Sequence, residues 1–127
     1  MKVAEKQEGY NSILEKSFAF SVRIVKFYIY ELKKHRDIEP LLKQVLKSGT
    51  SIGANISEAQ EASSKKDFIN KMSISLKEAR ETDYWLRLFD AANAIPSKEI
   101  ETMRSDNIEI IKLLTTIIKT AKKAMDN

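Results

Sequence analysis

Few side chains in this sequence could do chemistry, and the closest pair of candidates is Glu78 and Glu81. Two carboxylates three residues apart share one face of a helix, where they could exchange protons with a substrate or bind iron. A di-iron helical bundle also needs Glu-x-x-His motifs, and the single histidine lies far away in sequence. The simpler interpretation is i,i+4 ion pairs, Lys77 with Glu81 and Asp83 with Arg87. We therefore expect no catalytic activity.

The sequence contains few side chains that could bind a metal ion and none that carries a thiol. It contains no cysteine, which excludes a disulfide framework, a thiolate metal site and a cysteine nucleophile. His35, as the only histidine, excludes a histidine-rich metal site. We expect no metal and no other cofactor.

A row of polar side chains follows one face of a predicted helix. Its members, at steps of three and four residues, are Gln44, Ser48, Ser51, Asn55 and Glu58, and we call them the polar row. The row adjoins an apolar seam, so buried members would need partners such as Lys77, Glu78 and Glu81 of the next helix. A specific binding site is one interpretation. We favour a hydrogen-bonded layer that fixes helix register, with Asn55 and Glu58 bridging the second and third helices.

Gly49 and Gly53 lie inside the same predicted helix. Each costs roughly 1 kcal/mol relative to alanine in a helix interior, so packing must offset the loss. No Gly-Lys-Ser/Thr sequence follows them, which excludes a phosphate-binding loop. We expect the two glycines to admit a neighbouring helix at close range.

The basic residues occur in small groups along the chain. The candidates for contacts with phosphate are Lys43, Lys47, Lys65, Lys66, Lys119, Lys122 and Lys123. With 22 basic and 18 acidic residues, the net charge of +4 permits an anionic partner without requiring one. No helix combines a dense Arg/Lys stripe with Asn or Gln, as a base-reading helix would. Any nucleic-acid binding should therefore be non-specific.

Apolar residues exceed what one buried stripe per helix requires. The first predicted helix carries Phe18, Val22, Val25, Ile29 and Leu32 on one side, and Phe20, Ile24 and Phe27 roughly opposite. We expect the first set to face the core. The second set, together with Tyr84 and Trp85, is the candidate for contacts between subunits. Stacking of Tyr84 and Trp85 on nucleic-acid bases is the alternative.

These groups must be positioned by helices, because three glycines and two prolines in 127 residues leave too few turns for a sheet protein. Periodicity predicts one all-α domain over residues 1–127, with helices at about 12–34, 40–62, 65–93 and 98–124. Pro40 fits a first helical turn, and Ser64 with Asp67 resembles a capping box. Connections of a few residues force neighbouring helices to be antiparallel, which gives an up-down-up-down four-helix bundle.

The seams of the last two predicted helices are continuous. They are Phe68, Met72, Ser75, Ala79, Thr82, Leu86 and Phe89 in the third helix, and Ile100, Met103, Asn107, Ile110, Leu114, Ile117, Ala121 and Ala124 in the fourth. No uncharged run approaches the ~20 residues that cross a bilayer, and the amino terminus lacks the apolar region of a secretory signal. We expect a cytoplasmic protein without a membrane partner.

One combination of motifs resembles a known family. The residues that carry it are Gln44, Ser48 to Ile52, Ala54-Asn55-Ile56, Glu58-Ala59, Asp67-Phe68, Lys77-Glu78-Ala79, Glu81-Thr82 and Tyr84-Trp85-Leu86. They are similar to the bacterial four-helix-bundle proteins encoded in intervening sequences of 23S ribosomal RNA genes. That family also resembles the accessory protein of diversity-generating retroelements, which binds nucleic acid and partners a reverse transcriptase. Relatives often carry arginine where this chain has Lys47.

The resemblance implies a homopentamer with a central channel, and a surface that faces nucleic acid. Together with the residue patterns, it leads us to expect a non-enzymatic homo-oligomer that binds RNA or DNA non-specifically through basic side chains. The alternative is a protein-interaction scaffold, in which the surface holds another protein and the charge maintains solubility.

Overall fold

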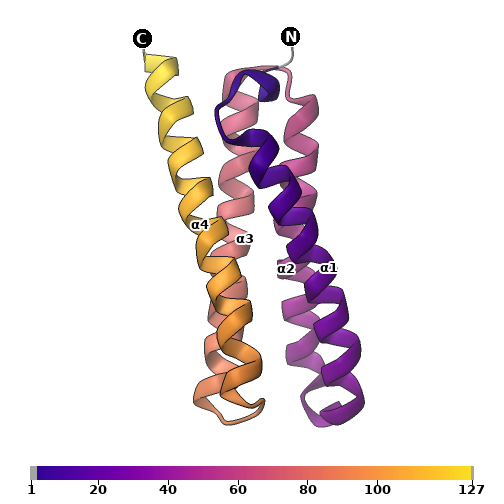
Figure 1. The fold of residues 1–127 in the computed structure, drawn as a ribbon. Coiled ribbons are helices and arrows are strands. Elements are labelled where there is room, and N and C mark those ends of the chain that lie inside the picture. Colours follow the sequence, from indigo (N-terminus) through magenta and orange to yellow (C-terminus); the bar gives the residue numbers. More distant parts are fainter. Residues whose placement is uncertain (1–2, 127) are drawn as a thin grey trace.

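The computed structural model describes residues 3–126, and four long helices account for most of them (Figure 1). They are α1 (Tyr10–Lys34), α2 (Glu39–Glu58), α3 (Lys65–Ala91) and α4 (Ser97–Asp126). Short 3-10 turns lie at Ala4–Lys6, Arg36–Ile38 and Ala59–Glu61, and the described residues form no strand. The predicted all-α four-helix bundle is confirmed.

Contacts between the helices show their relative directions. From α1 to α2, the Tyr10 hydroxyl donates to the Ile56 carbonyl, whereas Ile24 meets Gly49 further along α1. Contacts from α2 to α3 and from α3 to α4 have the same inverse order, as the pairs Ile52–Ser75 and Ser48–Thr82, and Ala79–Asn107 and Asp83–Arg104, show. Each consecutive pair is therefore antiparallel, and α1 is diagonally opposite α3 (Figure 1).

The ends of the helices follow local side-chain chemistry. Pro40 occupies the first turn of α2. The Ser64 hydroxyl accepts from the Asp67 N–H at 3.0 Å, and the Asp67 carboxylate accepts from the Ser63 N–H at 3.2 Å. The return bond of the predicted capping box thus goes to the N–H of Ser63, one residue before the N-cap residue Ser64. The second helix ends at Glu58, four residues before its predicted end, and a 3-10 turn follows.

The core is built from one seam of each helix. In α3 and α4 every residue of the predicted seams is buried except Ala124, and Ile69 and Ile118 are buried as well. In α1 the prediction was wrong. Phe20 and Ile24 are buried in the bundle, whereas Phe18, Val22, Val25 and Ile29 face outward. The candidate interface residues Phe20 and Ile24 are therefore core, and Phe27 packs against it. The residues expected in the core are exposed except Leu32, which is partly buried against the core.

The two glycines of α2 explain which side of α1 packs inward. A Cβ atom at Gly49 would lie 2.8 Å from Cγ1 and Cδ1 of Ile24. One at Gly53 would lie 2.9 Å from the Ser21 hydroxyl and 3.1 Å from the Ser17 carbonyl oxygen. All three distances are shorter than ordinary van der Waals contact, so α1 and α2 approach closely only because these positions lack side chains. This confirms the predicted role of the pair.

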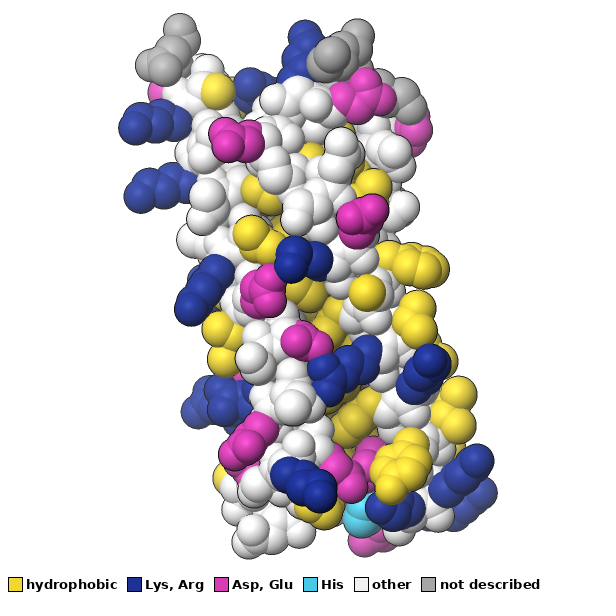
Figure 2. Space-filling view, in the orientation of Figure 1, with side chains coloured by type: hydrophobic (Ala, Val, Ile, Leu, Met, Phe, Trp, Pro, Cys, Tyr) yellow, Lys and Arg dark blue, Asp and Glu magenta, His cyan; other side chains and the backbone are white. Residues whose placement is uncertain are grey.

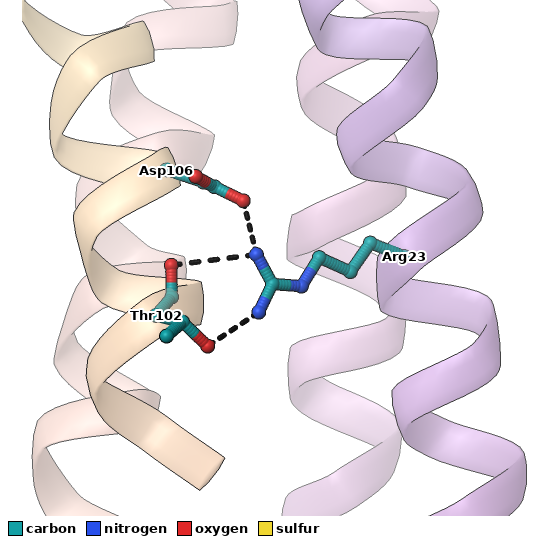
Figure 3. Close-up of polar contacts among 3 residues, drawn as sticks. All are labelled: Arg23, Thr102 and Asp106. Carbon is teal, nitrogen blue, oxygen red and sulfur yellow. Dashed lines mark hydrogen bonds and ion pairs between the residues drawn. The ribbon is translucent and has the colours of Figure 1, made fainter. Parts of the chain in front are cut away.

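The α1–α4 seam differs from the other three because polar side chains bridge much of it. Arg23 of α1 reaches across to Asp106 and to the hydroxyl and carbonyl of Thr102 (Figure 3). Lys16 pairs with Glu109 at 2.6 Å, also at the surface. These helices make fewer contacts than any other neighbouring pair. Exposed ion pairs contribute little stability, so this seam is the weakest of the bundle.

Candidate functional site

The basic residues of the second connection and of the chain's last turns lie at one end of the bundle. We call Lys65, Lys66, Lys119, Lys122 and Lys123 the basic end. They come together because α3 begins where α4 ends, and Figure 2 shows Lys and Arg side chains projecting over this part of α4. Among residues 3–126, none of these five lysines forms an ion pair within the chain. Their charges are therefore available to a partner.

A shallow hollow of about 570 Å³ lies at this end, between the start of α3 and the last turns of α4. It is lined by Ser64, Lys66, Asp67, Ile69, Asn70, Ser73 and Lys122. Two predicted phosphate contacts, Lys66 and Lys122, thus face one space from different helices. The Asp67 carboxylate is engaged by the Ser63 N–H, which reduces its competition with an incoming anion.

Lys43 and Lys47 lie apart from the basic end. Lys43 is 3.9 Å from Glu39, one turn earlier in α2. Lys47 lies near Glu78 of α3 and acts electrostatically on that carboxyl. The structure therefore divides the predicted lysines into a group of five without ion pairs and two that face acidic residues.

The polar row does not act as one unit. Ser51 and Asn55 bond to carbonyls one turn back in their own helix, those of Lys47 and Ser51, at 2.7 and 2.8 Å. Glu58 and Gln44 are exposed. The predicted bridge from Asn55 and Glu58 to α3 was wrong, because a helical Ser or Asn can satisfy itself on its own backbone. Of the polar row in the described chain, only Ser48 bonds to α3, by accepting from the Thr82 hydroxyl at 2.9 Å.

The buried polar layers are nevertheless real and lie within the predicted seams. The Ser75 hydroxyl donates to the Ile52 carbonyl at 2.8 Å, and the Asn107 amide donates to the Ala79 carbonyl at 2.8 Å. Ser48, Ser75, Thr82 and Asn107 are all fully buried. Since buried polar groups are costly unless bonded, these bonds fix the register of α2 on α3 and of α3 on α4.

The outer side of α1 presents the largest group of exposed apolar side chains. Phe18 is 71% exposed, Ile29 51%, Val25 41% and Val22 39%, and we call these four the apolar stripe. Figure 2 shows hydrophobic side chains along the edge where α1 lies. Beside the stripe, a groove of about 790 Å³ runs between α1 and α2 and is lined by Leu14, Phe18, Gly53, Ala54 and Ser57, among others. A stripe with a groove beside it is typical of an interaction surface.

Tyr84 and Trp85 have different surroundings. Their rings meet edge to face, with centroids 5.2 Å apart and planes at 77°. Tyr84 is 55% exposed on the outer side of α3, whereas Trp85 is partly buried and packs against the core. Trp85 also directs its indole N–H at Glu81, 3.4 Å away. Of this pair, only Tyr84 offers a face to a partner.

Comparison with known proteins identifies the family. The model of the 23S rRNA-intervening sequence protein family matches residues 10–116, which is most of the chain. The chain belongs to this family. Among solved structures, it is similar to a protein of unknown function from the S23 ribosomal protein family of Bacteroides thetaiotaomicron, with 47% sequence identity. That likeness covers 87% of this chain and 97% of the other, with a TM-score of 0.82. No curated protein matches the chain.

In this intervening-sequence protein Glu78 and Glu81 are not part of a cluster of side chains that could bind a metal ion. Within residues 3–126, no group of three or more His, Cys, Asp or Glu side chains is placed to hold a metal ion. Burial, and then the charge of Glu81, raise the pKa of Glu78, whereas Lys77 and Lys47 act in the opposite direction. The predicted pairs Lys77–Glu81 and Asp83–Arg87 are not among the ion pairs of the described chain. Asp83 instead binds Arg104 of α4, at 2.8 Å.

Sequence reasoning missed a second carboxyl pair in this intervening-sequence protein, at the end of the bundle opposite the basic end. Glu31 of α1 is only 1% exposed, and its carboxyl faces that of Glu99 from α4. Burial, and then Glu99, raise the pKa of Glu31 to about 7, and Lys34 opposes them. The sequence did indicate an unusual position for Glu31, because it continues the apolar line of Phe20, Ile24 and Phe27 at steps of three and four. A carboxylate in an apolar seam indicates a special environment.

No helix in the described part of this intervening-sequence protein has both the length and the apolar character needed to cross a bilayer.

Proposed function

We propose that this intervening-sequence protein is a non-enzymatic, cytoplasmic helical bundle that assembles into a homopentamer and binds RNA or DNA without sequence specificity. The observation that carries the assembly is the apolar stripe. Phe18, Val22, Val25 and Ile29 follow one another at steps of four, three and four, so they form a continuous seam that a helix of another subunit can cover. The subunit number comes from the family resemblance.

A second apolar position supports a ring. Tyr84 is exposed on the outer side of α3, and α3 is diagonally opposite α1. A closed ring needs a head-to-tail contact between two different surfaces of the subunit, whereas a two-fold dimer uses one surface twice. The stripe of one subunit against the Tyr84 side of the next satisfies that requirement.

The basic end supplies the contacts with nucleic acid. Lys66 and Lys122 face one hollow, and Lys65, Lys119 and Lys123 flank it without ion-pair partners in the described chain. Five subunits of charge +4 would carry about +20, which attracts phosphate backbones through counterion release. Lysine binds phosphate as a point charge, so binding by this surface should not depend on the base sequence of the nucleic acid.

Binding is tested by fluorescence anisotropy with labelled single-stranded RNA and duplex DNA at increasing salt. We expect binding at ~50 mM salt, a steep loss by ~200 mM, and little difference between sequences. Lys66→Glu with Lys122→Glu should weaken binding and flatten the salt dependence. Lys112→Glu is the matched control, because Lys112 is exposed on α4 away from the basic end. Absence of binding at ~50 mM salt would eliminate the nucleic-acid proposal.

The groove beside Phe18 favours one alternative, a scaffold that holds a different protein. Its volume of about 790 Å³ and mainly small lining residues could accept a bulky side chain of a partner. The two functions predict different results for the oligomeric state of the purified chain and for the retention of a partner after nuclease treatment. A scaffold is monomeric alone and retains its partner after nuclease treatment, whereas the proposed assembly forms from the purified chain.

A further inference from the structure

Glu31 and Glu99 form an acidic pair in which one oxygen of each carboxyl is buried without a hydrogen-bond donor in the described chain. The Oε2 atoms of both residues are buried, and within residues 3–126 neither accepts a hydrogen bond. Glu31 is fully buried, and Glu99 brings its carboxyl from α4 close enough for the two groups to share a hydrogen bond. Two adjacent carboxylates cannot both be ionised in such a place without a large loss of free energy.

Neighbouring groups only partly compensate the charge. The His35 Nε2 atom is 3.3 Å from Glu31 Oε2, and the Lys34 Nζ atom is 3.8 Å from Glu99 Oε1. Lys34 also donates to the Tyr30 hydroxyl at 2.8 Å. On the adjacent α2, Glu39 and Lys43 lie 3.9 Å from each other, and Arg36 and Asp37 in the connection are exposed. Each carboxyl thus has one basic neighbour, and the two carboxyls face each other.

A single shared proton would remove one of the two negative charges and supply the missing hydrogen-bond donor. If one carboxyl carries a proton, it becomes a donor to the other, and two acceptors without donors become one hydrogen bond. That bond joins α1 to α4, across the seam that the ion pairs of Arg23, Lys16 and Lys34 also bridge. We propose that Glu31 and Glu99 form a proton-dependent latch that holds α4 against α1, and that loss of the shared proton loosens this end of the bundle.

The direction of the pH dependence follows from linkage. Burial and Glu99 raise the pKa of Glu31 from 4.5 to about 7 in the folded protein, so folding retains a proton that the unfolded chain has lost. The stabilising bond is present below about pH 7. As pH rises from 4.5 through 7, the free energy of unfolding progressively falls, because the unfolded chain releases this proton at lower pH than the folded protein does. Above pH 7 both carboxyls are charged and repel each other.

The test compares wild type with Glu31→Gln by urea denaturation between pH 5 and 8. For wild type, we expect the unfolding equilibrium constant to rise by up to about two orders of magnitude across this range. Glu31→Gln keeps a donor and loses the charge, so its stability should change little with pH. Glu109→Gln, which removes an exposed carboxylate of the same seam, should behave like wild type. His35→Gln should also retain the dependence, which separates the latch from titration of the imidazole.

Opening of the seam is measured directly with spin labels. Because the chain has no cysteine, Lys33→Cys on α1 and Lys98→Cys on α4 place labels uniquely at exposed positions. Wild type should show a longer or broader distance distribution at pH 8 than at pH 5.5, and addition of Glu31→Gln should abolish the difference. If Glu31→Gln does not fold, Glu99→Gln takes its place. A distribution and a stability that are independent of pH in wild type, or equally dependent on pH in the Gln variants, would overturn the proposal.

Discussion

Replacing Gly49 by alanine tests how α1 is seated on α2. At an ordinary interior position of a helix, glycine to alanine stabilises by roughly 1 kcal/mol. Here the new Cβ would lie 2.8 Å from Cγ1 and Cδ1 and 3.0 Å from Cγ2 of Ile24, against about 3.5–4.0 Å for carbon atoms in contact. All three atoms belong to one fully buried side chain, so rotation of its tip cannot relieve the overlap.

The two effects have opposite signs, and their sizes decide the outcome. Overpacking a core costs about 1–3 kcal/mol, of which the helix propensity of alanine offsets roughly 1. We therefore expect Gly49→Ala to lower the free energy of unfolding by about 1 kcal/mol. The assay is urea denaturation followed by far-ultraviolet circular dichroism, at one fixed protein concentration because assembly would make stability depend on concentration.

A double-mutant cycle isolates the contact. In an Ile24→Ala background the three crowded atoms are absent, so Gly49→Ala should stabilise that variant. The coupling free energy between the two positions should be about 1–3 kcal/mol. A coupling near zero, or a stabilising effect of Gly49→Ala in the wild-type chain, would refute the reasoning that this glycine admits α1.

Three further predictions concern buried and bridging polar groups. Asn107→Ala removes the donor to the Ala79 carbonyl and should lower the free energy of unfolding by about 1–3 kcal/mol in urea denaturation. Asp83→Asn weakens the partly buried pair with Arg104 and should cost about 1 kcal/mol, an effect that disappears when Arg104 is also replaced by Gln. Burial, and then the charge of Glu61, raise the pKa of the Tyr10 phenol to about 12. A pH titration followed by absorbance near 295 nm should therefore show one tyrosine that ionises about two pH units above the ordinary value. Tyr10→Phe should remove that phase. Stability should correspondingly fall as pH rises through 10 to 12 in wild type and less in Tyr10→Phe.

The sequence was sufficient for most of the seams of α3 and α4 because one apolar line dominates each of these helices. Helix α1 is apolar on two sides, and its own spacing cannot decide which side is buried. Gly49 and Gly53 decide it, because the close approach they permit places Ile24 and Ser21 against α2. The exposed side then remains for other molecules. The prediction failed at α1 because it treated each helix separately.

The polar residues show a second limit of periodicity. Spacing placed Ser48 and Asn55 on the same line, but only Ser48 has a partner on α3, whereas Asn55 bonds to the Ser51 carbonyl in its own helix. Periodicity places Glu31 beside Phe20, Ile24 and Phe27, the residues predicted to contact another subunit, so it does not predict that Glu31 is buried. The predicted antiparallel bundle already implies that the start of α3 and the end of α4 lie at one end, but only the structure shows that Lys66 and Lys122 line the same hollow.

The central claim is that the apolar stripe of α1 joins copies of this chain, and light scattering coupled to size-exclusion chromatography tests it most directly. A chain of 14.5 kDa should elute as an assembly of about 73 kDa, five times that mass. Phe18→Glu with Val25→Glu, both in the stripe, should yield a folded monomer, and the exposed substitution Ser105→Glu on α4 should leave the assembly intact. A monomeric wild type, or a stripe variant of unchanged mass, would contradict the account.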